Sequence, residues 1–244
     1  LVHGLIAEAV FGDHPLGRPV IGTAEVISSI PRDAIASYHD SMYVPANIVV
    51  AAAGNIQHER VVELVERALE RRNVGAASRL NARPPLVHEP PPRLRFQQKD
   101  TEQYHVCLGA PGISRSDRRR FAASLLDGIL GGSASSRLFQ EIREKRGMAY
   151  AVYSFVSQYT DTGQIGVYLG TREDNLSDAL AITAEQIADI AAGNLPAREL
   201  ERAKENLKGR ILLSMESTST RMNRLGKSLI TDSELLSLDR IVAE

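Results

Sequence analysis

Tryptophan is absent from the sequence, and only 5% of the 244 residues are aromatic. This scarcity argues against an aromatic platform for carbohydrates or for stacked bases. The net charge of -1 gives no electrostatic reason to expect a nucleic acid or an anionic membrane as partner. No apolar run approaches the roughly 20 residues that a membrane-spanning helix needs. We therefore expect a protein that binds no nucleic acid and no membrane.

Cysteine is almost absent as well, because Cys107 is the only one and excludes a disulfide within the chain. A single cysteine and the lack of a signal peptide favour a reducing compartment, so we expect a cytoplasmic protein. Hydrophobic residues (43%) and charged residues (24%) occur in the usual proportions of globular proteins. The chain begins with Leu1 rather than methionine, which leads us to expect a piece of a longer protein.

The histidines lack the spacing of a helical metal site. A zinc pair on one helix needs histidines at positions i and i+4 with a carboxylate nearby, whereas the six histidines here are never closer than 11 residues apart. His58-Glu59 begins like the motif His-Glu-x-x-His, but Val62 occupies the second histidine position. Histidines that are distant in sequence could still meet in space. The sequence itself predicts no metal ligand in this chain.

No nucleophile has the neighbours that its chemistry needs. Gly131-Gly132-Ser133 lacks both the Gly-x-Ser-x-Gly elbow of serine hydrolases and the Gly-Lys-Ser/Thr ending of a phosphate loop. Cys107 lies between two apolar residues of an expected buried strand, which indicates an inert core thiol. We therefore assign no catalytic residue in this chain.

Proline and glycine divide the chain into two blocks. Residues 74–92 contain two proline clusters that exclude a helix or a central strand, and they predict an extended linker between residues 1–73 and residues 93–244. Periodicity and turn signals predict helices at 31–43, 61–69, 117–130, 137–146, 176–192 and 196–229, and strands at 48–53, 94–99, 103–110, 149–158 and 163–170. The element order suggests offset parts of one repeated unit, with the front of the first copy and the back of the second copy missing.

The octapeptide Arg143-Glu-Lys-Arg-Gly-Met-Ala-Tyr150 carries the most specific signal. Arg143 is expected near the end of a helix that Gly147 terminates, and Tyr150 near the start of a strand, sharing a face with Val152 and Ser154. One interpretation is structural, since basic residues stabilise a helix C-terminus and aromatic residues favour strands. The other is functional: guanidinium and phenol together donate hydrogen bonds to a carbonyl oxygen on which negative charge develops.

These residues also carry a family resemblance. The octapeptide, preceded by Gly131-Gly-Ser-Ala-Ser-Ser-Arg-Leu-Phe-Gln-Glu-Ile142, resembles the second homologous domain of pitrilysin/insulinase-type zinc metallopeptidases, in particular the processing-peptidase branch. The first block is similar to the second half of that family's first domain at His14-Pro-Leu-Gly-Arg-Pro-Val-Ile-Gly22, Tyr43-Val-Pro-Ala-Asn-Ile-Val-Val50 and Gly54-Asn55. The resemblance covers nearly the whole chain in the right order.

The resemblance implies an α+β fold of two homologous domains, each a largely antiparallel sheet backed by helices, and both incomplete here. It implies a zinc-dependent metalloendopeptidase that encloses a peptide or unfolded polypeptide in a chamber, where the substrate adds a strand to a sheet edge. Zinc would belong to the full-length protein, because the family's His-x-x-Glu-His motif is not in this chain. Arg143 and Tyr150 match the family's substrate-holding pair. The implied partners are the missing N-terminal part or a homologous subunit, and a homodimer is possible.

Two alternatives remain at this stage. The chain is either part of a working peptidase, or part of a non-catalytic peptide-binding homologue or partner subunit that never carried zinc ligands. An intact Arg143 and Tyr150 does not separate the two, since a partner subunit can donate the pair to a second chain. An unrelated α+β binding domain is the third and weakest possibility.

Made alone, this polypeptide is expected to bind no stoichiometric zinc and to cleave no peptide, because its sequence contains no ligand set of the required spacing. Metal analysis after zinc incubation and dialysis measures the first property, and a quenched-fluorescence peptide assay measures the second. A His-x-x-Glu-His peptidase treated in parallel is the control. One tightly held zinc ion per chain would contradict the prediction.

Overall fold

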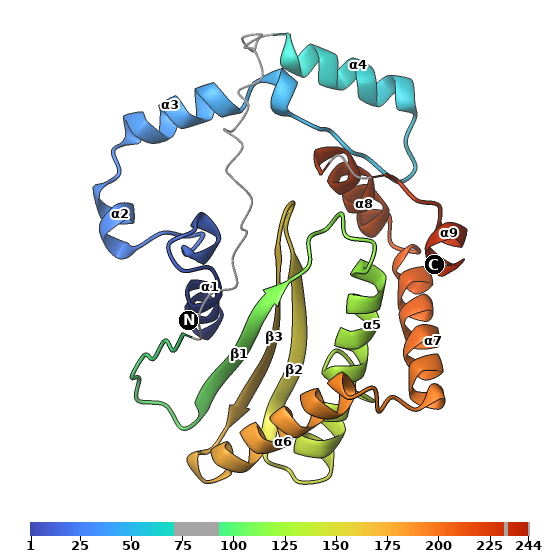
Figure 1. Ribbon diagram of the computed structural model, residues 1–244. Coiled ribbons are helices and arrows are strands. Elements are labelled where there is room, and N and C mark those ends of the chain that lie inside the picture. The colour runs from blue at the N-terminus through green and yellow to red at the C-terminus, as the bar shows by residue number, and fades with distance from the viewer. Residues whose placement is uncertain (71–92, 232–233, 244) are drawn as a thin grey trace. The chain divides into compact units, whose positions relative to one another are not determined.

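The computed structural model describes residues 1–70, 93–231 and 234–243, and these residues form two compact units (Figure 1). The first unit joins residues 1–20 to 93–208, and the second joins residues 21–70 to the described residues after 208. The sequence predicts instead two contiguous domains, 1–73 and 93–244, and those boundaries stay a prediction. The predicted linker at 74–92 lies outside the described residues.

The first unit is built on a three-stranded antiparallel sheet with strand order β1-β3-β2 (Figure 1). Its strands are β1 (Tyr104–Gly112), β2 (Ala149–Gln158) and β3 (Gly163–Thr171). The backbone amide of Tyr159 donates to the carbonyl of Thr162 at 2.8 Å and closes the hairpin between β2 and β3. The strands predicted at 103–110, 149–158 and 163–170 are confirmed. The strand predicted at 94–99 is wrong, because these residues pair with no described strand.

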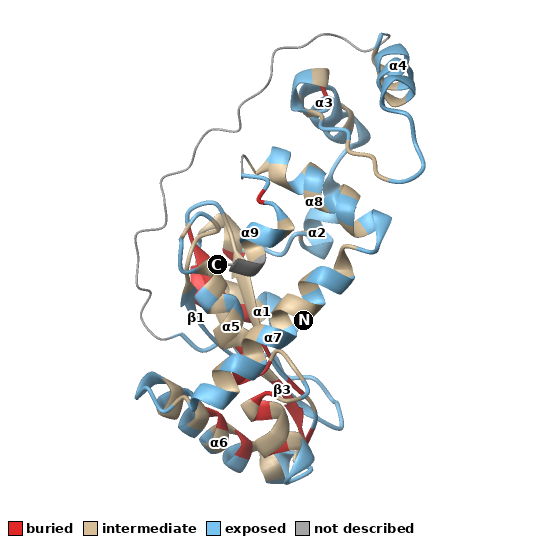
Figure 2. Ribbon diagram, turned by 90° about the vertical axis from the view of Figure 1, so that its right-hand side faces the viewer, coloured by how far each residue is buried: buried red, intermediate tan, exposed pale blue. Residues whose placement is uncertain are grey.

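Helices cover one face of this sheet. α5 (Arg120–Leu130) and η3, a π-helical segment (Phe139–Glu144), contact β2, while α6 (Glu173–Ala191) contacts β3. The core between them consists of Leu130, Leu138, Ile142, Ala149, Val152, Val167, Leu169 and Ala179. Figure 2 shows these buried residues gathered around the sheet and its helices. Each large aliphatic side chain contributes about 1.5–3 kcal/mol when fully buried, so this layer holds most of the unit's stability.

The opposite face of the sheet receives α1 (Val2–Phe11). Ile6, Ala9, Val10 and Phe11 form a second apolar cluster there, against which Cys107 and Phe155 are packed. Gly109 permits this approach, since a Cβ at that position would lie 2.8 Å from the Ile6 side chain. The expectation of a buried strand around Cys107 is wrong, because no residue of β1 is fully buried and Cys107 is half-buried. Burial still raises the pKa of the Cys107 thiol to about 11, and this shift keeps the thiol protonated at neutral pH.

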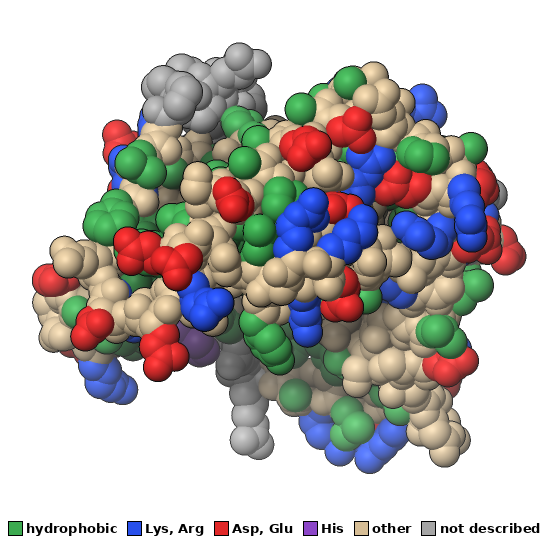
Figure 3. Space-filling view, turned by 90° about the horizontal axis from the view of Figure 1, so that it is seen from below, with side chains coloured by type: hydrophobic (Ala, Val, Ile, Leu, Met, Phe, Trp, Pro, Cys, Tyr) green, Lys and Arg blue, Asp and Glu red, His purple; other side chains and the backbone are tan. Residues whose placement is uncertain are grey.

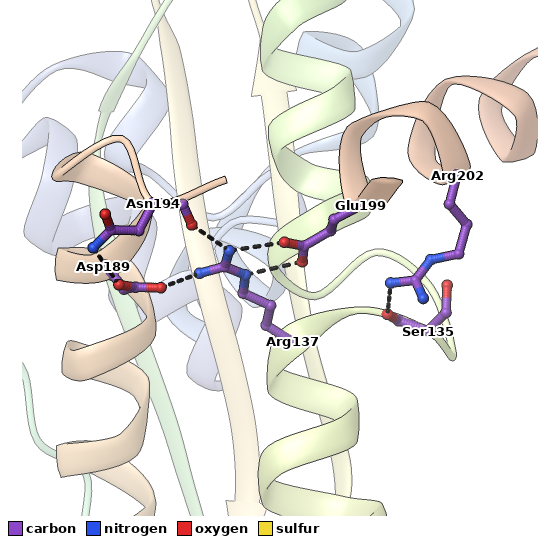
Figure 4. Close-up of polar contacts among 6 residues, drawn as sticks. All are labelled: Ser135, Arg137, Asp189, Asn194, Glu199 and Arg202. Atoms are coloured by element: carbon purple, nitrogen blue, oxygen red, sulfur yellow. Dashed lines mark hydrogen bonds and ion pairs between the residues drawn. The ribbon is translucent and has the colours of Figure 1, made fainter. Parts of the chain in front are cut away.

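A polar cluster joins the helical segment after α5 to α6 and α7 (Ala197–Ser214), as Figure 4 shows. Only 11% of the Arg137 side chain is exposed, and its guanidinium donates two hydrogen bonds to Glu199, at 2.9 and 2.8 Å. It also donates to Asp189 at 2.7 Å and to the carbonyl of Asn194 at 2.7 Å. Hydrogen bonds from Asn194 and then Arg137 hold the pKa of Asp189 below its usual value.

The second unit consists of helices and extended segments in the described part of the chain. Its helices are α2 (Ala24–Ser29), α3 (Arg32–Met42), η2 (Pro45–Asn47), α4 (His58–Leu69), α8 (Thr218–Ile230) and α9 (Leu238–Ala243). A short turn, η1 (Pro15–Gly17), belongs to the first unit. α3 and α4 show exposed surfaces almost throughout (Figure 2).

Two sequence predictions fail in the second unit. The helix predicted over 196–229 is interrupted, because turn hydrogen bonds at Met215–Ser217 end α7 and the Ser217 hydroxyl accepts the Thr220 amide at the start of α8. The strand predicted at 48–53 is wrong, because these residues pair with no described strand. A β-strand is stabilised by its ladder of hydrogen bonds to a neighbour, so a short apolar run alone does not produce one.

Replacing Arg137 by methionine should lower the free energy of unfolding by roughly 2 kcal/mol. This value lies between the about 3–5 kcal/mol for breaking a buried ion pair and the ~1 kcal/mol or less of an exposed one. Urea denaturation measures the loss. Arg202→Met is the matched control, since Arg202 makes one exposed hydrogen bond to the Ser135 carbonyl.

The stability difference between the wild type and Arg137→Met should depend on pH. The pKa of Asp189 is lower in the folded protein than in the unfolded chain. The stabilisation that the ionised carboxylate contributes is therefore complete above the unfolded pKa, near 3.9, and is lost as the pH falls through the folded pKa. The difference in unfolding free energy between the wild type and Arg137→Met should therefore shrink as the pH drops below about 4. A difference that stays constant from pH 7 to pH 3 would contradict the assigned contact.

Candidate functional site

The helical segment that carries Arg143 widens into a π-helical turn. The backbone amide of Lys145 donates to the carbonyl of Gln140, five residues earlier, at 3.0 Å. Gly147, with φ 62° in the left-handed region, ends the segment as the sequence predicts. Its amide donates to the carbonyl of Arg143, and the next amide, that of Met148, donates to the carbonyl of Ile142. π-turns of this kind are rare in proteins, and those that do occur are often found at functional sites.

Tyr150 occupies a β-bulge. Ala149 pairs with Thr171 and Ala151 pairs with Gly170, so Tyr150 is the extra residue in β2. Its exposed fraction is 78%, whereas Val152 and Ser154 are buried on the helix-covered face. The prediction that Tyr150 shares their face is therefore wrong. The extra residue interrupts the alternation of side chains and turns the tyrosine ring out of the core.

The π-turn and the bulge bring the two predicted residues together. The guanidinium carbon of Arg143 lies 4.9 Å from the centroid of the Tyr150 ring and above its face. It also lies 4.8 Å from the centroid of the Phe139 ring. These are cation–π contacts. The sequence therefore identified two residues that meet in space, but they meet as a cation over a ring and not as two donors side by side.

The edges of the Arg143 guanidinium remain available. Among the described residues, no acceptor forms a hydrogen bond with it, and its one ion-pair partner is Glu144, whose Oε1 lies 3.9 Å from Nε. About a third of the Arg143 side chain is exposed. No described acceptor engages its N–H groups, and the cation–π contacts with the two rings use no hydrogen-bond acceptor, so these donors can reach a ligand.

The two neighbouring cations are already paired. Glu141 forms ion pairs with the ammonium of Lys145 and, at 2.5 Å, with the guanidinium of Arg146. Hydrogen bonds from Lys145 and then Arg146 hold the pKa of Glu141 below its usual value. Lys145 and Arg146 thus share one carboxylate as ion-pair partner, whereas Arg143 forms no close ion pair among the described residues.

Sequence reasoning missed Phe139, Glu141 and the bulge. Phe139 stands four positions before Arg143, the spacing at which helical side chains touch, and that spacing was the available signal. Glu141 stands four positions before Lys145 and was detectable in the same way. The bulge had no such signal, because an extra residue in a strand is visible only when the partner strand is known.

The described residues supply neither a metal centre nor a membrane span. Nowhere in them do three or more His, Cys, Asp or Glu residues gather as ligands for a metal ion. No described helix combines the length and the apolar surface needed to cross a bilayer. Figure 3 shows acidic and basic side chains intermixed over the visible face, without a field of one sign.

Curated relatives of this chain are named zinc proteases. An uncharacterized zinc protease of Streptomyces coelicolor is 41% identical over 249 residues, which cover 99% of this chain and 54% of that protein. An uncharacterized zinc protease of Bacillus subtilis is 36% identical over 244 residues, covering 100% of this chain and 58% of that protein. The chain thus spans little more than half the length of these relatives. The described residues of this chain contain no group of ligands that fits a zinc ion.

A solved structure shares the fold. The peptidase M16 inactive domain from Pseudomonas fluorescens superposes with a TM-score of 0.82 at 24% identity, covering 99% of this chain and 60% of that chain. This confirms the predicted α+β fold with an antiparallel sheet backed by helices. A family model described as the peptidase M16 inactive domain matches residues 29–207. That match spans most of the sequence and includes the whole β1-β3-β2 sheet, so this chain belongs to the peptidase M16 family.

Proposed function

We propose that this chain is a portion of a zinc-dependent metalloendopeptidase of the processing-peptidase branch, which cleaves peptides or unfolded polypeptides in an enclosed chamber. In this proposal the chain contributes no catalytic residue. It contributes part of the chamber wall and two residues, Arg143 and Tyr150, that hold the substrate beside the bond to be cleaved. The names of the relatives support the protease class. A cytoplasmic location is part of the proposal, on the basis of the single cysteine.

The observation that carries the proposal is the contact between Arg143 and Tyr150. The guanidinium lies over the exposed ring and keeps its N–H groups unengaged among the described residues. Such a group donates strong, charge-assisted hydrogen bonds to a carbonyl oxygen. The bond strengthens as negative charge develops on that oxygen, which is the condition for lowering a transition state rather than merely binding a substrate.

Tyr150 has two separable roles in this arrangement. Its ring face contacts the guanidinium, and its hydroxyl, at the ring edge, is a second donor for the same peptide. The bulge matters for both roles, because a regular strand would direct the side chain to the face that the helices cover. The chemistry assigned to this residue thus depends on one irregular backbone position.

The sheet supplies a surface along which an extended substrate can lie. β1 and β2 are the outer strands among the described residues, and an outer strand offers unpaired amide and carbonyl groups to an added strand. Tyr150 lies near the start of β2. A polypeptide that pairs with this strand passes the Arg143 guanidinium, which joins substrate binding to the proposed donor pair.

A second candidate function is that of a non-catalytic peptide-binding homologue or partner subunit, acting with a second chain or as a homodimer. The matching family model describes an inactive domain, which favours this alternative. The two candidates differ in the full-length gene. A His-x-x-Glu-His motif within a domain's length upstream of Leu1 supports the peptidase, and a gene without it supports the partner subunit.

In the zinc protease that we propose contains this chain, Arg143→Ala and Tyr150→Phe should each lower kcat by about 100- to 1,000-fold, the cost of losing one oxyanion donor. The double variant should lose less than the product of the two, because both groups act on one oxygen. Arg143→Lys should recover little, since an ammonium lacks the planar fork of donors. Steady-state kinetics on a quenched peptide measures all four variants.

The matched control for these variants is Arg146→Ala. Arg146 belongs to the same helical segment and is paired with Glu141, so its loss should leave kcat within about twofold, as for an exposed ion pair. Thermal unfolding separates lost folding from lost chemistry. Near-normal turnover in Tyr150→Phe, at unchanged stability, would remove the proposed role and leave the pair as a structural contact.

A further inference from the structure

Phe139 makes the second ring contact with Arg143. The guanidinium carbon lies 4.8 Å from the Phe139 centroid and 4.9 Å from the Tyr150 centroid. The two aromatic residues come from different elements, one from η3 and the other from the first residues of β2. A side chain in contact with both elements has fewer accessible rotamers than one in contact with its own helix alone.

An arginine that binds a ligand needs such a restraint. A free arginine side chain populates many rotamers, and part of this freedom is lost when its donors are fixed. Arg143 has no hydrogen-bond acceptor among the described residues and one ion-pair distance of 3.9 Å. Its ring contacts are therefore the interactions that orient it. They restrict the position of the guanidinium, and no hydrogen-bond acceptor among the described residues takes the N–H groups that a carbonyl oxygen requires.

Phe139 is itself held in place. It is the first residue of η3, and the fully buried Leu138 and Ile142 anchor this segment against β2. Arg137, at the start of the same segment, is fixed by Glu199 and Asp189. The Phe139 ring is half-buried. Its ring thus belongs to a segment that the core holds in place, beside the flexible side chain of Arg143.

We propose that Phe139 is a positioning residue: it orients the Arg143 guanidinium so that its N–H groups face the peptide carbonyl. The inference rests on the proposed function of Arg143. It assigns Phe139 no contact with the substrate. Its effect should therefore depend on whether Arg143 is present, and it should act on turnover more than on substrate binding.

The contact itself is testable in the chain as it stands, without activity. An arginine Nε–H proton close to a ring face resonates upfield of its usual position because of the ring current. Phe139→Leu should move the Arg143 Nε–H resonance downfield, and Phe139→Tyr should leave it in place. Arg143→Lys removes the resonance and so assigns it. An unmoved resonance in a folded Phe139→Leu protein would overturn the inference.

A second stack in the same unit provides the matched control. Arg120 lies 4.7 Å from the centroid of the Phe121 ring at the start of α5. Phe121→Leu should shift the Arg120 resonance and leave that of Arg143 unchanged. It should also leave kcat of the full-length protein within about twofold. Phe121→Leu removes an arginine–phenylalanine contact outside the proposed site. It therefore measures how much the loss of such a contact affects the protein in general.

The kinetic test uses the full-length protein. Phe139→Leu should lower kcat by about tenfold with KM within about twofold, since a misplaced group costs up to about 100-fold, and Phe139→Tyr should restore it. In an Arg143→Ala background, Phe139→Leu should cause no further loss. A further loss of tenfold in that background would show that Phe139 acts independently of Arg143, and would overturn the inference.

The two proposals fail in different ways. If Arg143→Ala leaves turnover normal while the Phe139→Leu resonance shift is present, the proposed function fails and the orienting contact survives as structure. If Arg143→Ala is strongly impaired and Phe139→Leu is not, the proposed function stands and the positioning role is overturned. Melting temperatures of all variants exclude unfolding as the cause of either result.

Discussion

The burial of Leu138 and Ile142 against β2 is the constraint on which the site depends. Both side chains are completely buried, and each contributes about 1.5–3 kcal/mol to the packing of the segment. Their burial fixes which face of the helical segment points to the core. Phe139 and Arg143 therefore lie away from the core, beside the start of β2. A cavity at either position would loosen the donor and the protein core together.

Two backbone irregularities then set the positions of the two side chains of the proposed site. The π-turn lies in the segment that carries Arg143, and the bulge exposes Tyr150 from a strand whose next residues are buried. Both irregularities lie within the stretch from Phe139 to Ala151. Without the bulge, the regular alternation of β2 would place the Tyr150 side chain on the face that the helices cover. The local cost of the irregular backbone is offset by the surrounding core, which is why such features persist next to functional sites.

Charge is distributed so that one cation remains available. The hydrogen bonds of Arg137 go to Glu199 and Asp189 within the fold. Glu141 pairs with the two cations that follow Arg143 in the sequence, Lys145 and Arg146. The remaining guanidinium is held by rings, which orient it without competing for its hydrogen-bond donors. The proposed chemistry requires this division, because an arginine already paired with a carboxylate has little left to offer a peptide carbonyl.

The sequence by itself determined the fold class, the three strands of the sheet, the segment carrying Arg143 and the two residues that meet there. The strands and the helical segment follow from local periodicity and from glycine at a helix end, whereas the fold class and the residue pair follow from the family resemblance that the octapeptide carries. Only the tertiary structure decided the face on which Tyr150 lies, the contact between Phe139 and Arg143, the break before Ser217 and the lack of a paired strand at 48–53. Bulges, ring contacts and strand pairing depend on residues far apart in the chain, and a single sequence does not specify which of them become neighbours.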